Sequence, residues 1–149
     1  MPGGSLTAVA TWADVRRIAL ALPETSVGTS FGNEAWKVRD KTFAWRRPLR
    51  RGDLAALGAA ASDETPLAVR VADVGVRAAL IVDDPAVYFT IPHFEGYAAV
   101  LVRLDPVDVD ELAEVLAEAW LARAPASLAR RHPDVAGSRS GTAPPDAAG

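Results

Sequence analysis

The spacing of apolar residues changes along this chain, and that change limits the folds open to it. Near both ends, apolar residues recur every three or four positions, which is the repeat of a helix with one buried face. Between the ends lie short runs in which apolar and polar residues alternate, as in a half-buried strand. A block of strands with helices at its ends favours an α+β fold with an antiparallel sheet.

Two segments carry the helical repeat together with a starting signal. Thr11 and Asp14 occupy the positions of a capping box ahead of the apolar stripe in residues 12–21. A D-x-x-E box that begins at Asp108 precedes the clearest stripe, in residues 109–123. We therefore expect a helix near each end of the domain.

Five short strands are predicted between these helices, and residues 24–33, which hold two Gly, two Thr and two Ser, are predicted to form a loop. Alternation within the second strand places Phe43 and Trp45 on the same face. The order is α-β-β-β-α-β-β-α, a sheet of about five antiparallel strands with helices packed on one face. The predicted strands are 35–39, 41–46, 67–71, 87–91 and 98–104, with a short helix over 74–82.

The chain has 149 residues, which suits one domain on the usual scale of roughly 100–200 residues. We expect that domain over residues 11–131, preceded by a flexible arm (1–10). The Gly-, Ala-, Ser- and Pro-rich tail (132–149) is expected to be disordered. Residues 46–66 are interpreted as an extended hairpin loop.

Composition removes several classes of function. Cysteine is absent, which excludes disulfides, thiolate nucleophiles and cysteine-ligated metals. No apolar run approaches the ~20 residues of a membrane span, and residues 1–10 lack the positive start of a signal peptide. The expectation is a cytoplasmic protein with no membrane partner, no cofactor and no metal; the acidic face of the last helix is more typical of a solvated surface.

The net charge of −3 conceals two unlike halves. Residues 1–60 hold nine Lys/Arg against five Asp/Glu, a net of +4. Residues 61–149 hold seven Lys/Arg against fourteen Asp/Glu, a net of −7. An acidic protein repels polyanions at long range, but salt screens that repulsion beyond about 8–10 Å, so a local basic patch still attracts phosphate.

Four stretches together resemble the MmcQ/YjbR family of small bacterial proteins. They are WADVRRIALALP (12–23), TSFGNEAWKV (29–38), YFTIPHFEGYAAVLVRL (88–104) and DELAEVLAEAWLARAP (110–125). The resemblance covers about 120 residues and implies a CyaY-like (frataxin-like) α+β fold and a DNA-binding role. This sequence departs from the family in having Glu34 where a proline is usual, and in a longer segment after Trp45.

DNA binding is the first functional hypothesis. Lys and Arg neutralise phosphates, and the planar fork of Arg matches phosphate oxygens. The basic segment RRPLRR lies at the start of the long hairpin, and further cations cluster at the neighbouring turn and on the first helix. The candidate phosphate contacts are Arg46, Arg47, Arg50, Arg51, Lys37, Arg39, Lys41, Arg16 and Arg17. These residues equally suit solubilising charges at sheet edges.

Two alternatives remain open. A small-molecule binding or sequestration protein would use a tryptophan-lined cleft for a planar or antibiotic-like ligand, formed by Trp36, Trp45, His93, Tyr97 and Trp120. Aromatic residues at strand or helix spacing also suit the core. An enzyme would need an acid/base group such as His93, Glu95 and Tyr97, which share one loop. No nucleophile elbow, P-loop or dinucleotide fingerprint supports catalysis. The oligomeric state is not indicated.

Overall fold

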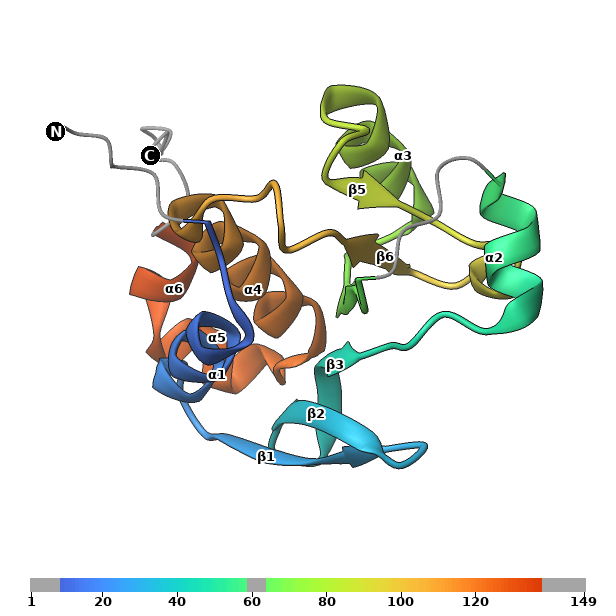
Figure 1. The fold of residues 1–149 in the computed structure, drawn as a ribbon. Coiled ribbons are helices and arrows are strands. Elements are labelled where there is room, and N and C mark those ends of the chain that lie inside the picture. The colour runs from blue at the N-terminus through green and yellow to red at the C-terminus, as the bar shows by residue number, and fades with distance from the viewer. Residues whose placement is uncertain (1–8, 59–63, 138–149) are drawn as a thin grey trace, which may run out of the picture.

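The computed structural model describes residues 9–58 and 64–137 (Figure 1). The predicted arm up to residue 8, residues 59–63 of the predicted hairpin loop and the tail from residue 138 lie outside the described residues. The elements are α1 (Trp12–Ala21), β1 (Thr25–Ser30), β2 (Asn33–Val38), β3 (Lys41–Arg46), α2 (Arg51–Leu57), β4 (Leu67–Arg70), α3 (Val74–Asp83), β5 (Tyr88–Phe89), the 3-10 turn η3 (Pro92–Phe94), β6 (Ala99–Val102), α4 (Val109–Arg123), α5 (Ala126–Arg131) and α6 (Pro133–Gly137).

Within these ranges the architecture is α+β, with six strands in one antiparallel sheet of order β1-β2-β3-β4-β6-β5. The sheet thus has six strands rather than about five, because the segment predicted to be a loop forms β1. Phe31 and Gly32 take positive φ angles of 51° and 80° and close a two-residue hairpin between β1 and β2. The glycine that suggested a loop makes this tight turn.

The predicted starts of the helices are confirmed. The Thr11 hydroxyl accepts from the Asp14 backbone N–H at 3.2 Å, and the Asp14 carboxylate accepts from the Thr11 N–H at 3.0 Å. The Asp108 carboxylate accepts from the Glu111 N–H at 2.8 Å at the start of α4. Each contact satisfies a backbone donor that the first helical turn leaves unpaired.

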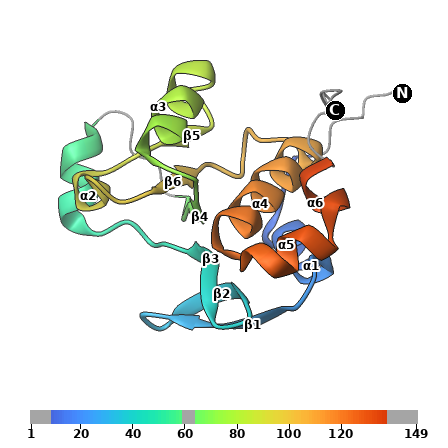
Figure 2. The same cartoon turned by 180° about the vertical axis from the view of Figure 1, so that it is seen from behind.

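Apolar residues cover both faces of the sheet, which corrects the prediction that helices pack on one face alone. On the first face, α1 and α4 enclose the larger core, which includes Trp36, Phe43 and Trp120. On the second face, Trp45 and Leu101 pack with apolar residues of the η3 region and α2, among them Phe94 and Leu57. Figure 2 shows α1, α4, α5 and α6 gathered apart from α2 and α3.

A β-bulge in β3 decides which side chains reach the second face. Trp36 pairs with Ala44, but the next residue of β2, Lys37, pairs with Thr42, so Phe43 is the additional residue. Phe43 and Ala44 both join the larger core, and the alternation is shifted by one position. The prediction that Phe43 and Trp45 share a face is therefore wrong, because the bulge directs Trp45 to the second face.

The packed unit includes residues at both predicted boundaries. Ala10 is buried in the larger core, and Val135 of α6 is buried in the same cluster. Residues 133–137 thus form a short helix where a disordered tail was expected. Among the described residues, none of the helices has the length and apolar character needed to cross a membrane.

Candidate functional site

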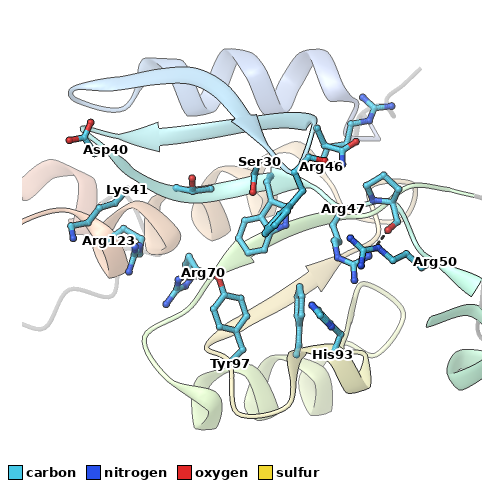
Figure 3. Close-up of a pocket in the computed structure, with 16 residues that line it drawn as sticks. Ser30, Asp40, Lys41, Arg46, Arg47, Arg50, Arg70, His93, Tyr97 and Arg123 are labelled. Carbon is cyan, nitrogen blue, oxygen red and sulfur yellow. Dashed lines mark hydrogen bonds between the residues drawn. The ribbon is translucent and has the colours of Figure 1, made fainter. Parts of the chain in front are cut away.

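A cavity of about 800 Å³ opens on the second face of the sheet (Figure 3). The tip of the β1–β2 hairpin, the end of β3 with its following residues, and the η3 loop surround it, together with the ends of β4 and α4. We call it the cationic cleft. Its lining residues are Ser30, Phe31, Asn33, Asp40, Lys41, Thr42, Trp45, Arg46, Arg47, Pro48, Arg50, Arg70, His93, Phe94, Tyr97 and Arg123.

Three aromatic rings make an apolar floor in this cleft. The Trp45 ring lies 6.2 Å from that of Phe94 and 6.3 Å from that of Tyr97, measured between centroids. Phe94 and Tyr97 meet edge-on, with centroids 5.5 Å apart. Trp45 and Phe94 are buried, whereas Tyr97 is partly open to solvent. The bulge in β3 allows Trp45 to lie in this floor while Phe43, two residues earlier, packs in the larger core.

The cleft concentrates positive charge. Six of the chain's sixteen Lys/Arg residues line it, and Asp40 is the one carboxylate among the described lining residues. Such a density of cations in a chain of net charge −3 produces a local field that attracts anions. The lining cations are Lys41, Arg46, Arg47, Arg50, Arg70 and Arg123.

Arg47 is the most buried of these cations. Its side chain is 9% exposed and its Nη1 donates to the Asp53 carboxylate at 3.1 Å and to the Pro48 carbonyl. Asp53 belongs to α2 and also accepts from the Arg50 backbone N–H at 2.9 Å. Arg47 Nη2 is buried and has no hydrogen-bond partner among the described residues. The guanidinium therefore retains an unsatisfied donor although it is paired.

Arg70 and Arg123 come from distant parts of the sequence and lie together at the other end of the cleft, beside Tyr97 (Figure 3). Arg70 Nη1 donates to the Tyr97 hydroxyl at 3.2 Å, and its guanidinium lies 4.7 Å from the centre of that ring. Arg123 Nε is buried without a partner among the described residues. Burial, and then the charge of Arg70, lower the pKa of Arg123 from its ordinary value.

The loop that carries Tyr97 is fixed by an arginine from α3. Arg77 Nη1 donates to the backbone carbonyls of Phe94 and Tyr97, each at 2.8 Å, and of Ala99 at 3.3 Å. Helix α3 itself has no fully buried side chain. These contacts fix the backbone that carries two of the three floor rings, those of Phe94 and Tyr97.

The predicted phosphate contacts divide into two groups. Four of them line the cleft: Lys41, Arg46, Arg47 and Arg50. The other five lie outside it. Three of these form ion pairs: Arg16 with Glu34 at 2.8 Å, Arg17 with Asp14 at 2.9 Å and Arg39 with Glu24 at 2.7 Å. Lys37 lies over Gly28, and Arg51 is exposed at the start of α2. Three of the predicted cations are thus already neutralised by ion pairs within the protein. The cleft thus brings together four of the nine predicted contacts.

The predicted tryptophan-lined cleft is wrong for two of its members. Trp36 and Trp120 are fully buried in the larger core. Trp36 stacks on Trp12 with centroids 6.3 Å apart, and Trp120 Nε1 donates to the Pro23 carbonyl at 2.9 Å. Their place on the first face follows from strand and helix spacing, which normally marks core residues. The remaining members, Trp45, His93 and Tyr97, line the cationic cleft.

The three residues of the predicted acid/base group do not share one cavity. His93 is exposed and lines the cleft together with Tyr97. Glu95 lines a separate, smaller pocket of about 530 Å³ beside Gly96 and Thr90. The described geometry therefore supplies no carboxylate partner for His93 inside the cleft.

Sequence reasoning missed Arg70, Arg123, Phe31 and Phe94 as lining residues. An outward arginine on a predicted strand was the available signal for Arg70. Arg123 ends a helix that packs mainly on the first face, so nothing in its local pattern indicates a cleft on the second.

Comparison with known proteins identifies relatives of this chain. The chain is 49% identical over 123 residues to the Mycobacterium tuberculosis protein Rv2570 and to the Mycobacterium bovis protein Mb2600, both described as uncharacterized. The match covers 80% of this chain and 93% of each relative.

A solved structure shares the fold. The crystal structure of Deinococcus radiodurans protein DR2400, which contains the family-model domain DUF419, superposes with a TM-score of 0.59. The alignment covers 86% of this chain and 89% of that one, at 18% identity. Because the YjbR sequence model matches residues 20–122, which is more than half of the chain, the protein belongs to the YjbR family.

Proposed function

We propose that this protein binds a small, flat organic anion in the cationic cleft. The observation that carries the proposal is the combination, in one cavity, of an aromatic floor with arginines that retain buried, unpartnered nitrogens. These nitrogens are Arg47 Nη2 and Arg123 Nε. A buried donor without a partner costs about 1–3 kcal/mol, and more when it is charged. A ligand oxygen that accepts from these donors offsets that cost.

The size and the floor of the cleft favour a ring-bearing ligand. Small-molecule sites commonly occupy about 300–1,000 Å³, and this cavity of about 800 Å³ lies within that range. The indole of Trp45 and the phenol of Tyr97 offer apolar surface of the kind on which a flat ring packs.

The charge balance favours an anion. Asp53 compensates Arg47, but no described carboxylate forms an ion pair with Arg70, Arg123 or Arg50. A partly desolvated cation without a counter-ion is unfavourable, so binding an anion stabilises the folded protein. We expect the ligand to remain unchanged, because the cleft offers binding groups and no assembled acid/base pair.

Isothermal titration calorimetry with naphthoate and neutral naphthamide, which share a ring and a shape, tests this function. We expect saturable naphthoate binding that is at least about tenfold tighter than binding of naphthamide, the usual scale for one charge-assisted hydrogen bond. Trp45→Leu is expected to lower the affinity for both ligands, because it removes the largest ring of the floor. Equal affinity for the two ligands would contradict an anion site.

DNA binding is a second candidate, and one observation favours it. Lys41, Arg50 and Arg51 are exposed, and none of them forms an ion pair with a described carboxylate. Arg50 and Arg51 belong to the basic segment that sequence reasoning singled out, and because all three side chains are exposed, duplex phosphates would reach them at the surface. The buried Arg47 is not suited to that contact.

The DNA candidate is tested by fluorescence anisotropy of a labelled random duplex at about 50 and 200 mM salt, where phosphate contacts lose affinity steeply. The double variant Arg50→Ala/Arg51→Ala is expected to weaken binding and flatten the salt dependence. Arg130→Ala, an exposed cation on α5, serves as the control. Duplex affinity that is identical in the double variant and the control would remove this candidate.

A further inference from the structure

The end of the cleft formed by Arg70 and Arg123 differs from the opposite end. At the opposite end, Arg47 is held at 3.1 Å by Asp53, so that cation already has its counter-charge. Neither Arg70 nor Arg123 forms an ion pair with a carboxylate of the described residues. In Figure 3, Arg70 and Arg123 lie on one side of Tyr97, and Arg47, Arg50 and His93 lie on the other. The Arg70–Arg123 end therefore holds two arginines without an ion pair to a described carboxylate, and the Arg123 Nε there is buried.

The Arg70 guanidinium is held in a fixed orientation. Its Nε donates to the Ala98 carbonyl at 3.1 Å, and its Nη1 donates to the Tyr97 hydroxyl at 3.2 Å. Its position over the Tyr97 ring adds a cation–π contact at 4.7 Å. Nη2 has no hydrogen bond to a described residue, so it remains available to a ligand.

The Arg123 guanidinium, in contrast to that of Arg70, is not held by hydrogen bonds to described residues. Its Nε is buried, and it forms no ion pair with a described carboxylate. Figure 3 places its guanidinium beside that of Arg70, on the same side of Tyr97. Burial, and then the charge of Arg70, lower the pKa of Arg123. Two guanidinium groups held close without an acid between them suit an oxyanion that accepts from both.

We propose that Arg70 and Arg123 form a subsite for a doubly charged oxyanion, so that the ligand is a phosphate monoester of a flat ring seated towards Trp45. This assignment rests on the function proposed above. A phosphate monoester carries a charge of about −1.5 to −2 at neutral pH and presents three acceptor oxygens. It therefore compensates both arginines, whereas a carboxylate or a sulfate ester brings a single charge.

The subsite predicts a particular effect on the unliganded protein. Arg123 is partly desolvated and is repelled by Arg70, so replacing it with an apolar residue of similar length relieves both effects. Arg123→Met is expected to raise the melting temperature without ligand and to weaken phosphate binding at the same time. A purely structural arginine would give a lower melting temperature.

The decisive experiment is calorimetry at pH 8 with naphthyl phosphate and naphthyl sulfate, which share shape and differ in charge. We expect the wild-type protein to bind the phosphate at least about tenfold more tightly than the sulfate. Arg70→Gln and Arg123→Gln should each lower phosphate affinity about tenfold and remove its preference over sulfate. Arg130→Gln, which removes one exposed charge outside the cleft, should leave both affinities unchanged.

Inorganic phosphate separates the anion subsite from the aromatic floor. It should compete with naphthyl phosphate in the wild type and in Trp45→Leu, but not in Arg123→Gln. Because Arg70→Gln also removes the bond to the Ala98 carbonyl, Arg123→Gln carries the test if the former variant is unstable.

Two results would overturn the subsite, and they differ in what they say about the wider proposal. Equal binding of phosphate, sulfate and naphthoate, unaffected by Arg123→Gln, would disprove the subsite and leave the anion-binding function standing. An absence of binding by all three compounds to the wild type would overturn both.

Discussion

Phe43 and Trp45 are two residues apart on β3, yet they lie on opposite faces of the sheet. An uninterrupted strand would place both on the same face. The additional residue at Phe43 changes the alternation, so Phe43 packs in the larger core and Trp45 enters the cationic cleft. Trp36 and Trp45, which are on neighbouring strands, consequently have different roles, because Trp36 pairs with Ala44 in the larger core and Trp45 pairs with Ala35 on the second face.

Replacing these two tryptophans should therefore give different results. Trp36→Ala removes a fully buried ring and is expected to cost about 3–5 kcal/mol of unfolding free energy. Trp45→Ala should cost less, because one side of that ring borders the cleft, but it should abolish naphthoate binding. Urea denaturation and calorimetry measure the two effects. Retained naphthoate affinity in Trp45→Ala would contradict the role of the ring as the floor.

At the ion pair between Arg47 and Asp53, a single substitution should lower the stability of the protein much more than substitution of both residues. Both side chains are 9% exposed, so Asp53→Asn leaves a buried guanidinium without its counter-charge, at a cost of about 3–5 kcal/mol. Arg47→Met/Asp53→Leu removes both charges and should recover much of that loss. Chemical denaturation of the variants measures it, and a double variant no more stable than Asp53→Asn would show that the charges are not coupled.

Alkaline conditions should destabilise the protein through Tyr88. Burial, and then the hydrogen bond that its hydroxyl donates to Glu111 at 2.6 Å, raise the pKa of Tyr88 far above its ordinary value. The folded protein keeps this proton above about pH 10, where the unfolded chain loses it, so stability falls as pH rises through that range. Denaturation midpoints should therefore decline less steeply above pH 10 in Tyr88→Phe, and equal slopes would contradict this coupling.

Phe31 should affect ligand binding without affecting stability. The ring is 92% exposed at the tip of the β1–β2 hairpin, yet it lines the cleft. Phe31→Ser is expected to leave the melting temperature within about 2 °C, because surface changes usually alter stability by under 0.5 kcal/mol. The same change should lower the affinity for naphthyl phosphate severalfold, because it removes apolar surface at the mouth of the cleft. Val27→Ser, an exposed change on β1 outside the cleft, is the matched control.

The sequence predicted those elements whose signals are local. The capping residues Thr11 and Asp108 indicated the starts of α1 and α4, because a cap and its first turn are adjacent in the chain. Strand β1 was missed because Gly, Ser and Thr are typical of loops. Only its pairing with β2 makes it a strand.

The cleft was predicted only in part, for a different physical reason. Arg46, Arg47 and Arg50 were identified as a basic segment, and Trp45, His93 and Tyr97 as ligand contacts. Trp45 directly precedes that segment in the sequence, but nothing local indicated that His93 and Tyr97 share its cavity, since the sheet order brings them together. Arg70 and Arg123 are 53 positions apart, so their encounter is a property of the tertiary fold alone.

The three hydrogen bonds that Arg77 donates to backbone carbonyls couple the cleft to local unfolding of α3. Helix α3 buries no side chain fully, so few apolar contacts oppose its release from the sheet, and low-contact elements open first. Opening α3 would withdraw Arg77 and free the loop that bears Phe94 and Tyr97. A ligand held on those rings therefore stabilises α3 at a distance, and should slow hydrogen exchange in a helix that it does not touch.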